Sequence, residues 1–466
     1  MKIQVTIEKF NILYLISFLI VVLIPLNILV KLEDFILPAW LSLFLFTYLL
    51  GLLFWLRAKD FLYASLLVFF YVFLLLAPLI QISNGSFPWG TPWAGPYSTI
   101  YIVEAWWMTF LSLLFFEVGY VLFRKFQNKE SGNVIEPLLS NRGKIILVGV
   151  AVVCTIVGLA VFGGAQLFLP RNAVVEGATF TNTSIGPIIS AIFRVPAVII
   201  FLLFLYDLIS QIKYKDHPKN IKFSLWLLVF IFLIIAIINN PISTPRFWVG
   251  AIFLSSVLLY LLACNKLKAA SWFMLNVAIL VAVFPIMDVY RKSLDSSFIE
   301  AVSNINPEGE LADSPDFDAF QQQVNSIVVR DISDFSMGNQ TLSSLFFFVP
   351  RAVWSNKSLA SGVVIAELME YDFKNLSAPL FTEFYLDGWF FGVCMGMFLL
   401  GALYRKVQTM HIYRKTPLPA IFYCFFCAYQ VYFLRGSLMA VVGFLFVAIL
   451  LFSAINIFKR LFYKPI

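Results

Sequence analysis

Long apolar runs alternate with short polar connections along most of the chain. About 20 consecutive apolar residues in a helix cross a bilayer core, and twelve runs come close to that length. The seventh and eighth runs are the shorter ones. We therefore predict twelve membrane-spanning helices, over residues 12–30, 36–56, 61–82, 101–123, 143–165, 187–211, 222–238, 248–264, 271–289, 380–403, 417–434 and 437–457.

Basic residues are distributed unevenly over the connections between these runs. If both termini are cytoplasmic, the inner segments hold 22 of the 33 Lys and Arg residues. The short outer segments then hold only four of them: Lys31, Arg171, Arg246 and Arg435. Because Lys and Arg concentrate in cytoplasmic loops of membrane proteins, we predict that both termini lie inside.

The composition agrees with a polytopic membrane protein. Of the 466 residues, 61% are hydrophobic and only 13% are charged, against about a quarter in ordinary soluble domains. These values exclude a soluble globular domain, a disordered chain and a collagen-like repeat. All five cysteines lie in apolar runs, so a disulfide framework is not expected. The predicted fold class is an all-α transmembrane bundle.

One connection, at about residues 290–379, is far longer than the others. It separates spans one to nine, in residues 1–289, from spans ten to twelve, in residues 380–466. Within it, Ser314 and the following Pro and Asp have the pattern of a helix start. Apolar residues follow at helical spacing: Phe317, Phe320, Val324, Ile327 and Val328. We expect an amphipathic helix on the membrane or on the spans, and a second apolar stretch at 344–354 that could re-enter the membrane. Together they would cap an outward-facing cavity.

Several arginines lie on the predicted outer side, where basic residues are normally scarce. Arg194 is near the outer end of span six, Arg246 and Arg435 are in very short connections, and Arg291 lies just outside a span. A single arginine of this kind can extend to lipid headgroups. Several on one side predict a basic pocket for a lipid-linked phosphate or pyrophosphate, because a guanidinium binds phosphate through a planar fork of donors. Arg246, Arg351 and Arg435 are the first candidates for this pocket, with Arg194 and Arg291 as second choices.

The predicted outer side offers carboxylates but no histidine for acid–base chemistry. Both histidines, His217 and His411, fall in predicted cytoplasmic loops. Glu383 and Asp387 open span ten and stand four residues apart on one helix face, so we predict that one of them handles a substrate hydroxyl. The structural alternative is an acid pair favoured by the helix dipole. No metal or other cofactor is expected, since the arginines can neutralise phosphate charge.

Aromatic residues gather at the predicted outer ends of the early spans. Trp89 and Trp93 lie in the connection after span three, followed by Tyr97, Trp106 and Trp107. One interpretation is the aromatic belt of the membrane interface. The other is a stacking surface for sugar rings, in which Trp89 and Trp93 bind sugar.

The last third of the chain carries three local patterns: Pro350-Arg351-x-x-Trp354-x-x-Lys357, Glu383-x-Tyr385-x-Asp387-Gly388, and Arg435-Gly436-Ser437. With these patterns, the predicted spans and the long late loop, the chain resembles bacterial Wzy-type polymerases of O-antigen or oligosaccharide repeat units. Some members carry an Arg-x10-Gly pattern in two outer loops. Arg351 and Gly362 match it once, and no second copy follows Arg246 or Arg171, so a paired-loop mechanism does not carry over.

The resemblance implies a GT-C-like membrane glycosyltransferase in the bacterial cytoplasmic (inner) membrane, with its active site facing outward. Such enzymes transfer a growing glycan from undecaprenyl pyrophosphate to the non-reducing end of a new lipid-linked repeat unit, and undecaprenyl pyrophosphate leaves. The product would be O-antigen, capsule or exopolysaccharide. The matching patterns add Trp354, Lys357 and Tyr385 as sugar-binding candidates. Expected partners are undecaprenyl-pyrophosphate-linked oligosaccharides, membrane lipids and a chain-length regulator protein, and not nucleic acid.

Two other functions fit the same architecture. An O-antigen ligase would move finished glycan to another acceptor, but ligases usually carry a histidine in the outer loop, and this loop has none. A transporter or flippase of lipid-linked sugars would also suit twelve spans. Transporters tend to show internal repeats, and no repeat is visible between the two halves of this sequence. A structural or receptor role, with the loop as a binding cap, is a further alternative.

Overall fold

The computed structural model describes most of the chain, and every regular element in the described part is a helix. The described residues are 12–32, 36–91, 93, 95–123, 139–164, 167, 185–213, 218–241, 243–264, 267–286, 306–413 and 417–462.

Twelve helices in these ranges are long and apolar enough to cross a membrane, which confirms the predicted number of spans. The first six are α1 (Ile12–Lys31), α2 (Leu37–Trp55), the continuous unit α3–η1–α4 (Phe61–Asn84), α5 (Thr99–Leu122), α6 (Asn141–Phe162) and α8 (Ile185–Lys213). The others are α9 (Pro218–Ile238), α10 (Arg246–Ala263), α11 with the π-helical turn η4 (Ala269–Ile286), α18 (Leu380–Tyr413), α19 (Pro417–Arg435) and α20 (Leu438–Ile457). The chain is a multi-pass membrane protein, and the cytoplasmic location of its termini stays a prediction.

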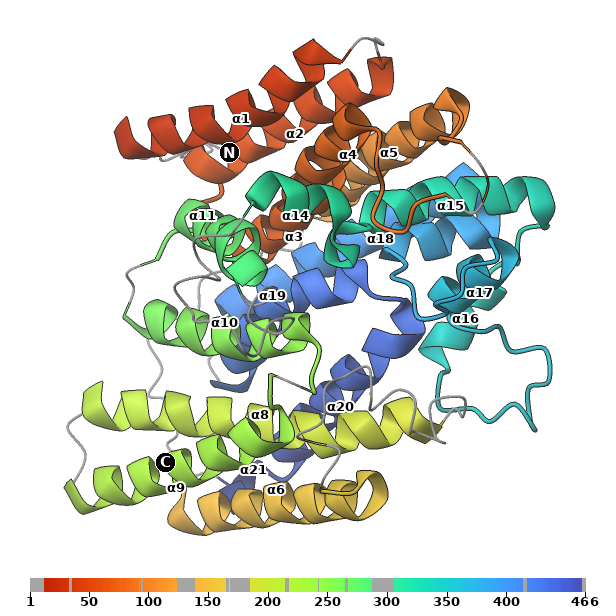
Figure 1. Cartoon of the computed structure of the whole chain (residues 1–466). Coiled ribbons are helices and arrows are strands. Elements are labelled where there is room, and N and C mark those ends of the chain that lie inside the picture. Colours follow the sequence, from red (N-terminus) through yellow and green to blue (C-terminus); the bar gives the residue numbers. More distant parts are fainter. Residues whose placement is uncertain are drawn as a thin grey trace.

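The third span lies at the centre of the bundle. Every side chain from Phe61 to Gln81 is buried, and α2, α11, α18 and α19 pack around it (Figure 1). A helix with neighbours on all sides needs an apolar surface on all sides, as this sequence has. Inside, Trp272 of α11 donates its indole N–H to the Ser65 hydroxyl at 2.8 Å. The π-helical turn η1 (Val72–Leu76) interrupts the regular helix near its loop-facing end.

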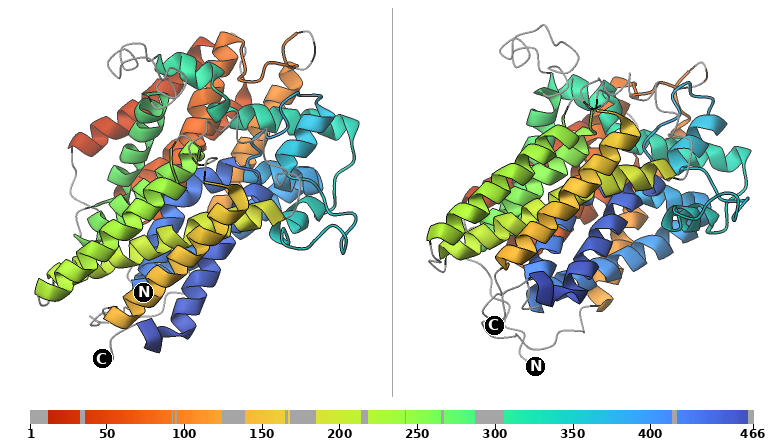
Figure 2. Two further views of the ribbon diagram at one scale, coloured as in Figure 1. Left: turned by 60° about the horizontal axis from the view of Figure 1, so that its bottom comes forward. Right: turned by 90° about the horizontal axis from the view of Figure 1, so that it is seen from below.

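A second group of spans lies apart from this centre. Helices α6, α8 and α9 pack against one another, and α8 also contacts α10 and α20. They occupy the lower part of Figure 1, opposite α1 and α2, and Figure 2 shows them as a layer along one side of the molecule. Helix α20 therefore joins the late spans to this layer.

The described part of the long loop, from residue 306 onward, folds onto one end of the bundle, which we call the loop face. Its described part contains α14 (Pro307–Asp313), the 3-10 turn η5 (Pro315–Phe317), α15 (Ala319–Ile332), α16 (Asn339–Leu345) and α17 (Ser361–Leu368). Helix α14 packs on α4, α15 on α5 and α18, and α16 on α18 and α20.

Helix α15 corrects the prediction of an amphipathic helix after Ser314. Ser314 accepts from the Asp316 N–H at 3.5 Å and so caps η5, whereas the long helix begins at Ala319. The apolar positions are buried as predicted, but so is the polar face: every side chain from Ala319 to Val329 is buried. Periodicity identified the helix, but it could not show that loops and other helices cover its polar side. The stretch 344–354 contains the end of α16 and the turns that follow it.

Helix α18 is broken near its start. Gly388 and Trp389 have non-helical backbone angles. Trp389 has a φ of 52°, and residues other than Gly rarely adopt a positive φ. Beyond the break, a Cβ added to Gly392 would lie 2.0 Å from the carbonyl oxygen of Phe384. The glycine therefore lets the two segments of α18 approach closely.

Glycines also allow α5 and α18 to pack tightly. A Cβ at Gly401 would lie 2.1 Å from the Phe116 carbonyl oxygen, and one at Gly119 would lie 2.0 Å from the Phe398 carbonyl oxygen. Small residues of this kind let transmembrane helices approach at the backbone level.

We expect Gly401→Ala to destabilise the protein by up to about 3 kcal/mol, because the added methyl group meets backbone that cannot move aside easily. Thermal unfolding of the purified protein would measure the effect. Gly149→Ala is the control, since a Cβ at that position of α6 has nothing within 4 Å. Equal unfolding temperatures for the two variants would contradict a close α5–α18 contact.

Candidate functional site

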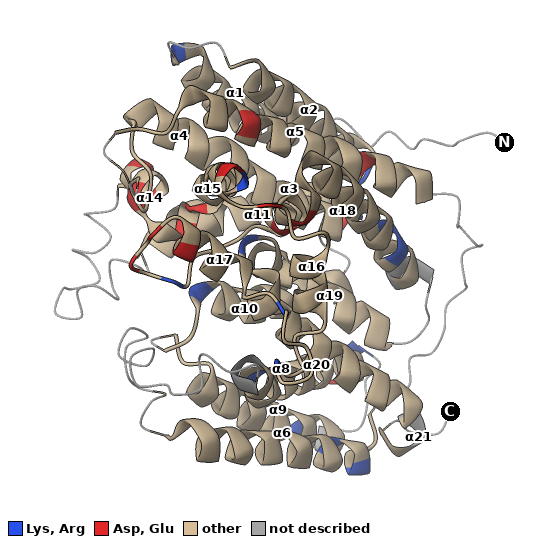
Figure 3. Ribbon diagram, turned by 90° about the vertical axis from the view of Figure 1, so that its right-hand side faces the viewer, with Lys and Arg blue, Asp and Glu red and all other residues tan. Residues whose placement is uncertain are grey.

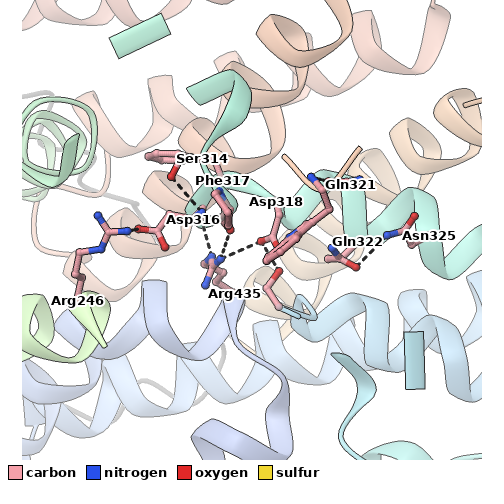
Figure 4. Close-up of polar contacts among 12 residues, drawn as sticks. Arg246, Ser314, Asp316, Phe317, Asp318, Gln321, Gln322, Asn325 and Arg435 are labelled. Carbon is pink, nitrogen blue, oxygen red and sulfur yellow. Dashed lines mark hydrogen bonds and ion pairs between the residues drawn. The ribbon is translucent and has the colours of Figure 1, made fainter. Parts of the chain in front are cut away.

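Two of the predicted arginines, Arg246 and Arg435, meet at one short segment of the loop (Figure 4). Arg246 is the first residue of α10 and Arg435 is the last residue of α19. The Arg246 Nη2 atom is 2.5 Å from Asp316 Oδ2. Arg435 donates from Nε to the Asp316 carbonyl at 2.7 Å and from Nη2 to the Pro315 carbonyl at 2.6 Å. We call Arg246, Arg435 and residues 315–318 the arginine clasp.

Helix electrostatics explain why the two arginines differ in their partners. Arg435 stands at the C-terminus of a helix, where the dipole favours a cation, whereas Arg246 stands at an N-terminus, where it does not. The Asp316 carboxylate compensates for that cost. The Arg435 guanidinium also lies 4.9 Å from the ring centroid of Phe247, within the range of a cation–π contact. Because the side chains of Arg246 and Arg435 are 11% and 16% exposed, the clasp is partly dry but still open to solvent.

Aromatic rings form an apolar floor beneath the clasp. Phe73, from the π-helical turn η1, stacks on Phe317 with centroids 5.4 Å apart and lies 6.1 Å from Phe247. Gln81 of α4 donates to the carbonyls of Leu311 and Phe317, both at 3.0 Å, and so fixes η5 on the bundle. Excluding water from one side strengthens the charge interactions above this floor.

Asp318 is the second acid that Arg435 contacts, and its side chain is only 1% exposed. It accepts from Arg435 Nη2 at 3.0 Å, from the Ser377 hydroxyl at 2.6 Å and from the Trp89 indole N–H at 2.8 Å. A buried carboxylate needs several such donors. The Trp89 ring stacks on Phe373 at 5.2 Å. The predicted sugar-binding Trp89 therefore has its N–H bound to Asp318 and one ring face covered.

The polar face of α15 forms a buried hydrogen-bond network next to the clasp. Gln321 donates to the Gly90 carbonyl at 2.6 Å and to the Tyr97 hydroxyl at 3.0 Å. Tyr97 in turn donates to Asn325 Oδ1 at 2.6 Å, and its hydroxyl lies 3.2 Å from that of Tyr371. Burial raises the pKa of both phenols. These bonds join Gly90, Tyr97 and Tyr371 to α15.

The predicted catalytic acids, Glu383 and Asp387, each bind the N-terminus of another helix. Glu383 is fully buried; it accepts from the Leu438 N–H at 2.5 Å, at the start of α20, and from the Ser344 hydroxyl at 3.2 Å. Asp387 accepts from the backbone N–H groups of Gln340 at 2.8 Å and Thr341 at 2.9 Å, at the start of α16. In this arrangement both carboxylates satisfy free N–H groups of helix ends, and neither contacts the clasp arginines.

A second charged cluster lies at the other end of α15. Arg330 forms ion pairs with Glu104 of α5 and, at 3.0 Å, with Asp331, and it donates to the Tyr385 hydroxyl at 3.4 Å. Tyr101 donates to Asp331 at 2.9 Å. The hydrogen bond from Arg330 lowers the pKa of Asp331. The predicted sugar-binding Tyr385 thus belongs to this cluster and not to the clasp.

Arg194 supports the clasp indirectly. Its Nη1 atom donates to the Ile238 carbonyl at 2.9 Å, where α9 ends, and to the Thr244 hydroxyl at 2.6 Å. Thr244 precedes Arg246 by two residues. Arg194 therefore stabilises the turn between α9 and α10, which positions Arg246.

Arg351 and Lys357 do not reach the clasp. Arg351 donates to the carbonyls of Lys357 and Ser358, the latter at 2.9 Å, and Lys357 donates to those of Phe347 and Val349. The predicted sugar-binding Trp354 lies in the same turn, where its backbone N–H donates to the Pro350 carbonyl at 3.1 Å. Gly362, the second residue of the Arg-x10-Gly pattern, packs on residue 376: a Cβ there would lie 2.1 Å from the Leu376 carbonyl oxygen.

The remaining candidates give no further contact with the clasp. Trp93 is 39% exposed and packs edge-on against Tyr97, with centroids 5.6 Å apart. Arg291 lies outside the described residues. In the part of the chain that the structure describes, no group of three His, Cys, Asp or Glu side chains is placed to hold a metal ion.

Comparison with protein-family models, with curated proteins and with solved structures finds no match to this chain. The geometry of the clasp is therefore the main guide to function.

The sequence pattern predicted both arginines of the clasp, but it did not predict their acidic partners, Asp316 and Asp318. Asp316 appeared only as a helix-start acid, and Asp318 was one of twelve acids in the loop. Their positions, one and three residues after Pro315, were the available signal.

Proposed function

We propose that this protein is a membrane glycosyltransferase that polymerises undecaprenyl-pyrophosphate-linked oligosaccharide repeat units. It would transfer the growing glycan to the non-reducing end of a new lipid-linked unit at the loop face, with that face outside a bacterial cytoplasmic membrane. The product would be O-antigen, capsule or exopolysaccharide.

The observation that carries the proposal is the convergence of Arg246 and Arg435. They lie 189 positions apart in the sequence and at the ends of different spans, yet both contact the same turn. Asp316 already places a carboxylate on Arg246. Carboxylate and phosphate oxygens match the guanidinium fork in the same way, and a diphosphate carries more charge, so it can displace Asp316.

This geometry suits the chemistry of a diphosphate leaving group. The acceptor hydroxyl oxygen forms a bond to the anomeric carbon of the donor sugar, and the bond from that carbon to the diphosphate oxygen breaks. The electron pair stays with undecaprenyl pyrophosphate, and the hydroxyl proton would pass to a carboxylate at the loop face, Glu383 or Asp387. Two guanidinium groups in a partly dry site would stabilise the charge that grows on the leaving group. The undecaprenyl tail would lie against the apolar spans next to the clasp.

Three interrupted spans favour a second candidate, a transporter or flippase of lipid-linked sugars. The π-helical turns η1 and η4 (Ile279–Val283) and the break at Gly388 disturb three of the twelve spans. Broken helices are common in transporters. A transporter would use the same clasp to bind the diphosphate without cleaving it.

The decisive experiment uses the purified protein in nanodiscs with undecaprenyl-diphosphate-linked repeat units, because nanodiscs provide no compartment to transport into. We expect a ladder of glycans that grows by one repeat unit per step, resolved by gel electrophoresis and mass spectrometry. No ladder in nanodiscs, together with movement of the same lipid across vesicle bilayers, would support the transporter and reject the polymerase.

A further inference from the structure

The tip of the long loop exposes apolar side chains to the surroundings of the protein. We define the loop tip as residues 337–359, which include α16 and the coil after it, at the right-hand edge of Figure 1. Met337 and Val353 are each 79% exposed. Five further large apolar residues of the tip are also exposed: Leu342, Leu345, Phe346, Phe348 and Leu359.

Two long polar side chains of the loop tip, Lys357 and Gln340, point inward. Lys357 is only 4% exposed, and its ammonium group donates to the carbonyls of Phe347 at 2.6 Å and Val349 at 2.8 Å. Gln340 is also buried and donates to the Leu359 carbonyl at 2.7 Å. Backbone polar groups without partners are costly in lipid, and these two side chains satisfy three carbonyls of the tip. Arg351 is exposed, but its guanidinium donates to the carbonyls of Lys357 and Ser358. The inward Lys357 and the outward apolar side chains reverse the usual arrangement of a loop in water.

Acidic residues are absent from this part of the sequence. Residues 335–366 contain no Asp or Glu, whereas seven acids lie between residues 308 and 334 and three more between residues 367 and 372. In Figure 3 the acids of the loop gather around α14, α15 and α17. Acids are costly in an apolar medium, and their absence from the tip matches contact with lipid.

The exposed surface of the tip continues the lipid-facing surface of a span. Phe348 stacks on Phe446 of α20, with ring centroids 5.6 Å apart. Phe446 is 37% exposed, and Ile449 and Leu450 on the same helix are 44% and 51% exposed. Because α20 is one of the twelve candidate spans, its exposed apolar residues face lipid. The exposed apolar residues of the tip therefore lie beside the exposed apolar residues of α20.

We propose that the loop tip, residues 337–359, inserts into the acyl-chain region of the lipid leaflet on the loop face. The partner of this surface is the membrane itself. The side chains of Met337, Phe348 and Val353 would lie at the outer ends of the acyl chains, while the exposed Arg351 and Asn356 would lie at headgroup level. Since Asp387 holds the N-terminus of α16, insertion fixes the tip relative to α18.

The test places an NBD fluorophore on Val353→Cys or Lys374→Cys in the full-length protein, reconstituted in phosphatidylglycerol–phosphatidylethanolamine nanodiscs. Lys374 is exposed in the acidic part of the loop, so Lys374→Cys is the water-exposed control. Label on the parent protein, which has four cysteines in the spans and Cys264 directly after α10, gives the background. We expect doxyl lipids to quench the label at position 353 at least threefold more than at position 374, and aqueous iodide to show the opposite order.

Two results would overturn the proposal. Iodide quenching at position 353 equal to that at position 374 would place the tip in water. If neither agent quenches the label at position 353, the tip is covered by protein, either another part of the chain or a second copy. Met337→Cys provides an independent position, and it should behave as Val353→Cys does. Each labelled variant must elute as a single species, which excludes a result caused by misfolding.

Discussion

An Arg435→Ala variant should lose glycan polymerisation by about 100-fold or more. Removing one preorganised donor to a developing negative charge typically costs 10²–10³ in rate, and Arg435 carries a full charge at the proposed diphosphate site. The rate of ladder growth in nanodiscs measures the loss. Arg435→Lys keeps the charge but not the planar fork, so we expect an intermediate rate. Lys374→Ala, a charge-matched change at an exposed position, should retain the parent rate.

The Asp316→Asn variant separates a binding role of the clasp from a purely structural one. Asn removes the competing carboxylate from Arg246, so the affinity for inorganic pyrophosphate should rise several-fold, as measured by calorimetry. If the clasp only holds the loop in place, Asp316→Asn and Arg435→Ala would both lower the unfolding temperature and leave pyrophosphate binding unchanged. That outcome would contradict the diphosphate site even if the protein still makes polymer by another route.

The spans were predictable because their signal is local. An apolar run of suitable length determines a span without reference to the rest of the chain, and all twelve predicted runs correspond to helices. The central span could also be recognised as apolar on every side. Its central position could not, since that depends on which helices surround residues 61–81.

The site was less predictable because it depends on pairing across long sequence separations. The uneven distribution of basic residues marks Arg246 and Arg435 as unusual outer cations, and both belong to the clasp. Arg351 is marked in the same way, although this residue bonds carbonyls of its own turn. Spacing on one helix face suggested that Glu383 and Asp387 act together. Their actual partners are the ends of α20 and α16, which no local pattern in α18 could indicate.

A buried ion pair away from the loop face joins Lys144 of α6 and Asp207 of α8. The Lys144 Nζ and Asp207 Oδ2 atoms are 2.7 Å apart, and both side chains are 2% exposed. Lys144 also donates to the Ser224 hydroxyl of α9 at 2.7 Å. Asp207 accepts from the Leu139 N–H at 2.8 Å and from the Gln211 amide at 2.6 Å. The pair therefore joins all three helices of the second group.

We expect Asp207→Ala to destabilise the protein by about 3–5 kcal/mol, because it leaves the Lys144 ammonium buried without a counter-charge. The double variant Lys144→Met with Asp207→Leu should recover most of that loss, since an apolar pair of similar volume removes the charge problem. Thermal unfolding in nanodiscs measures both effects. A single variant as stable as the parent would contradict the buried ion pair. A double variant as unstable as the single one would show that the loss does not come from the unpaired Lys144 charge. The double variant should also polymerise glycan at the parent rate, because the pair lies in the α6–α8–α9 group and its contacts involve no residue of the clasp.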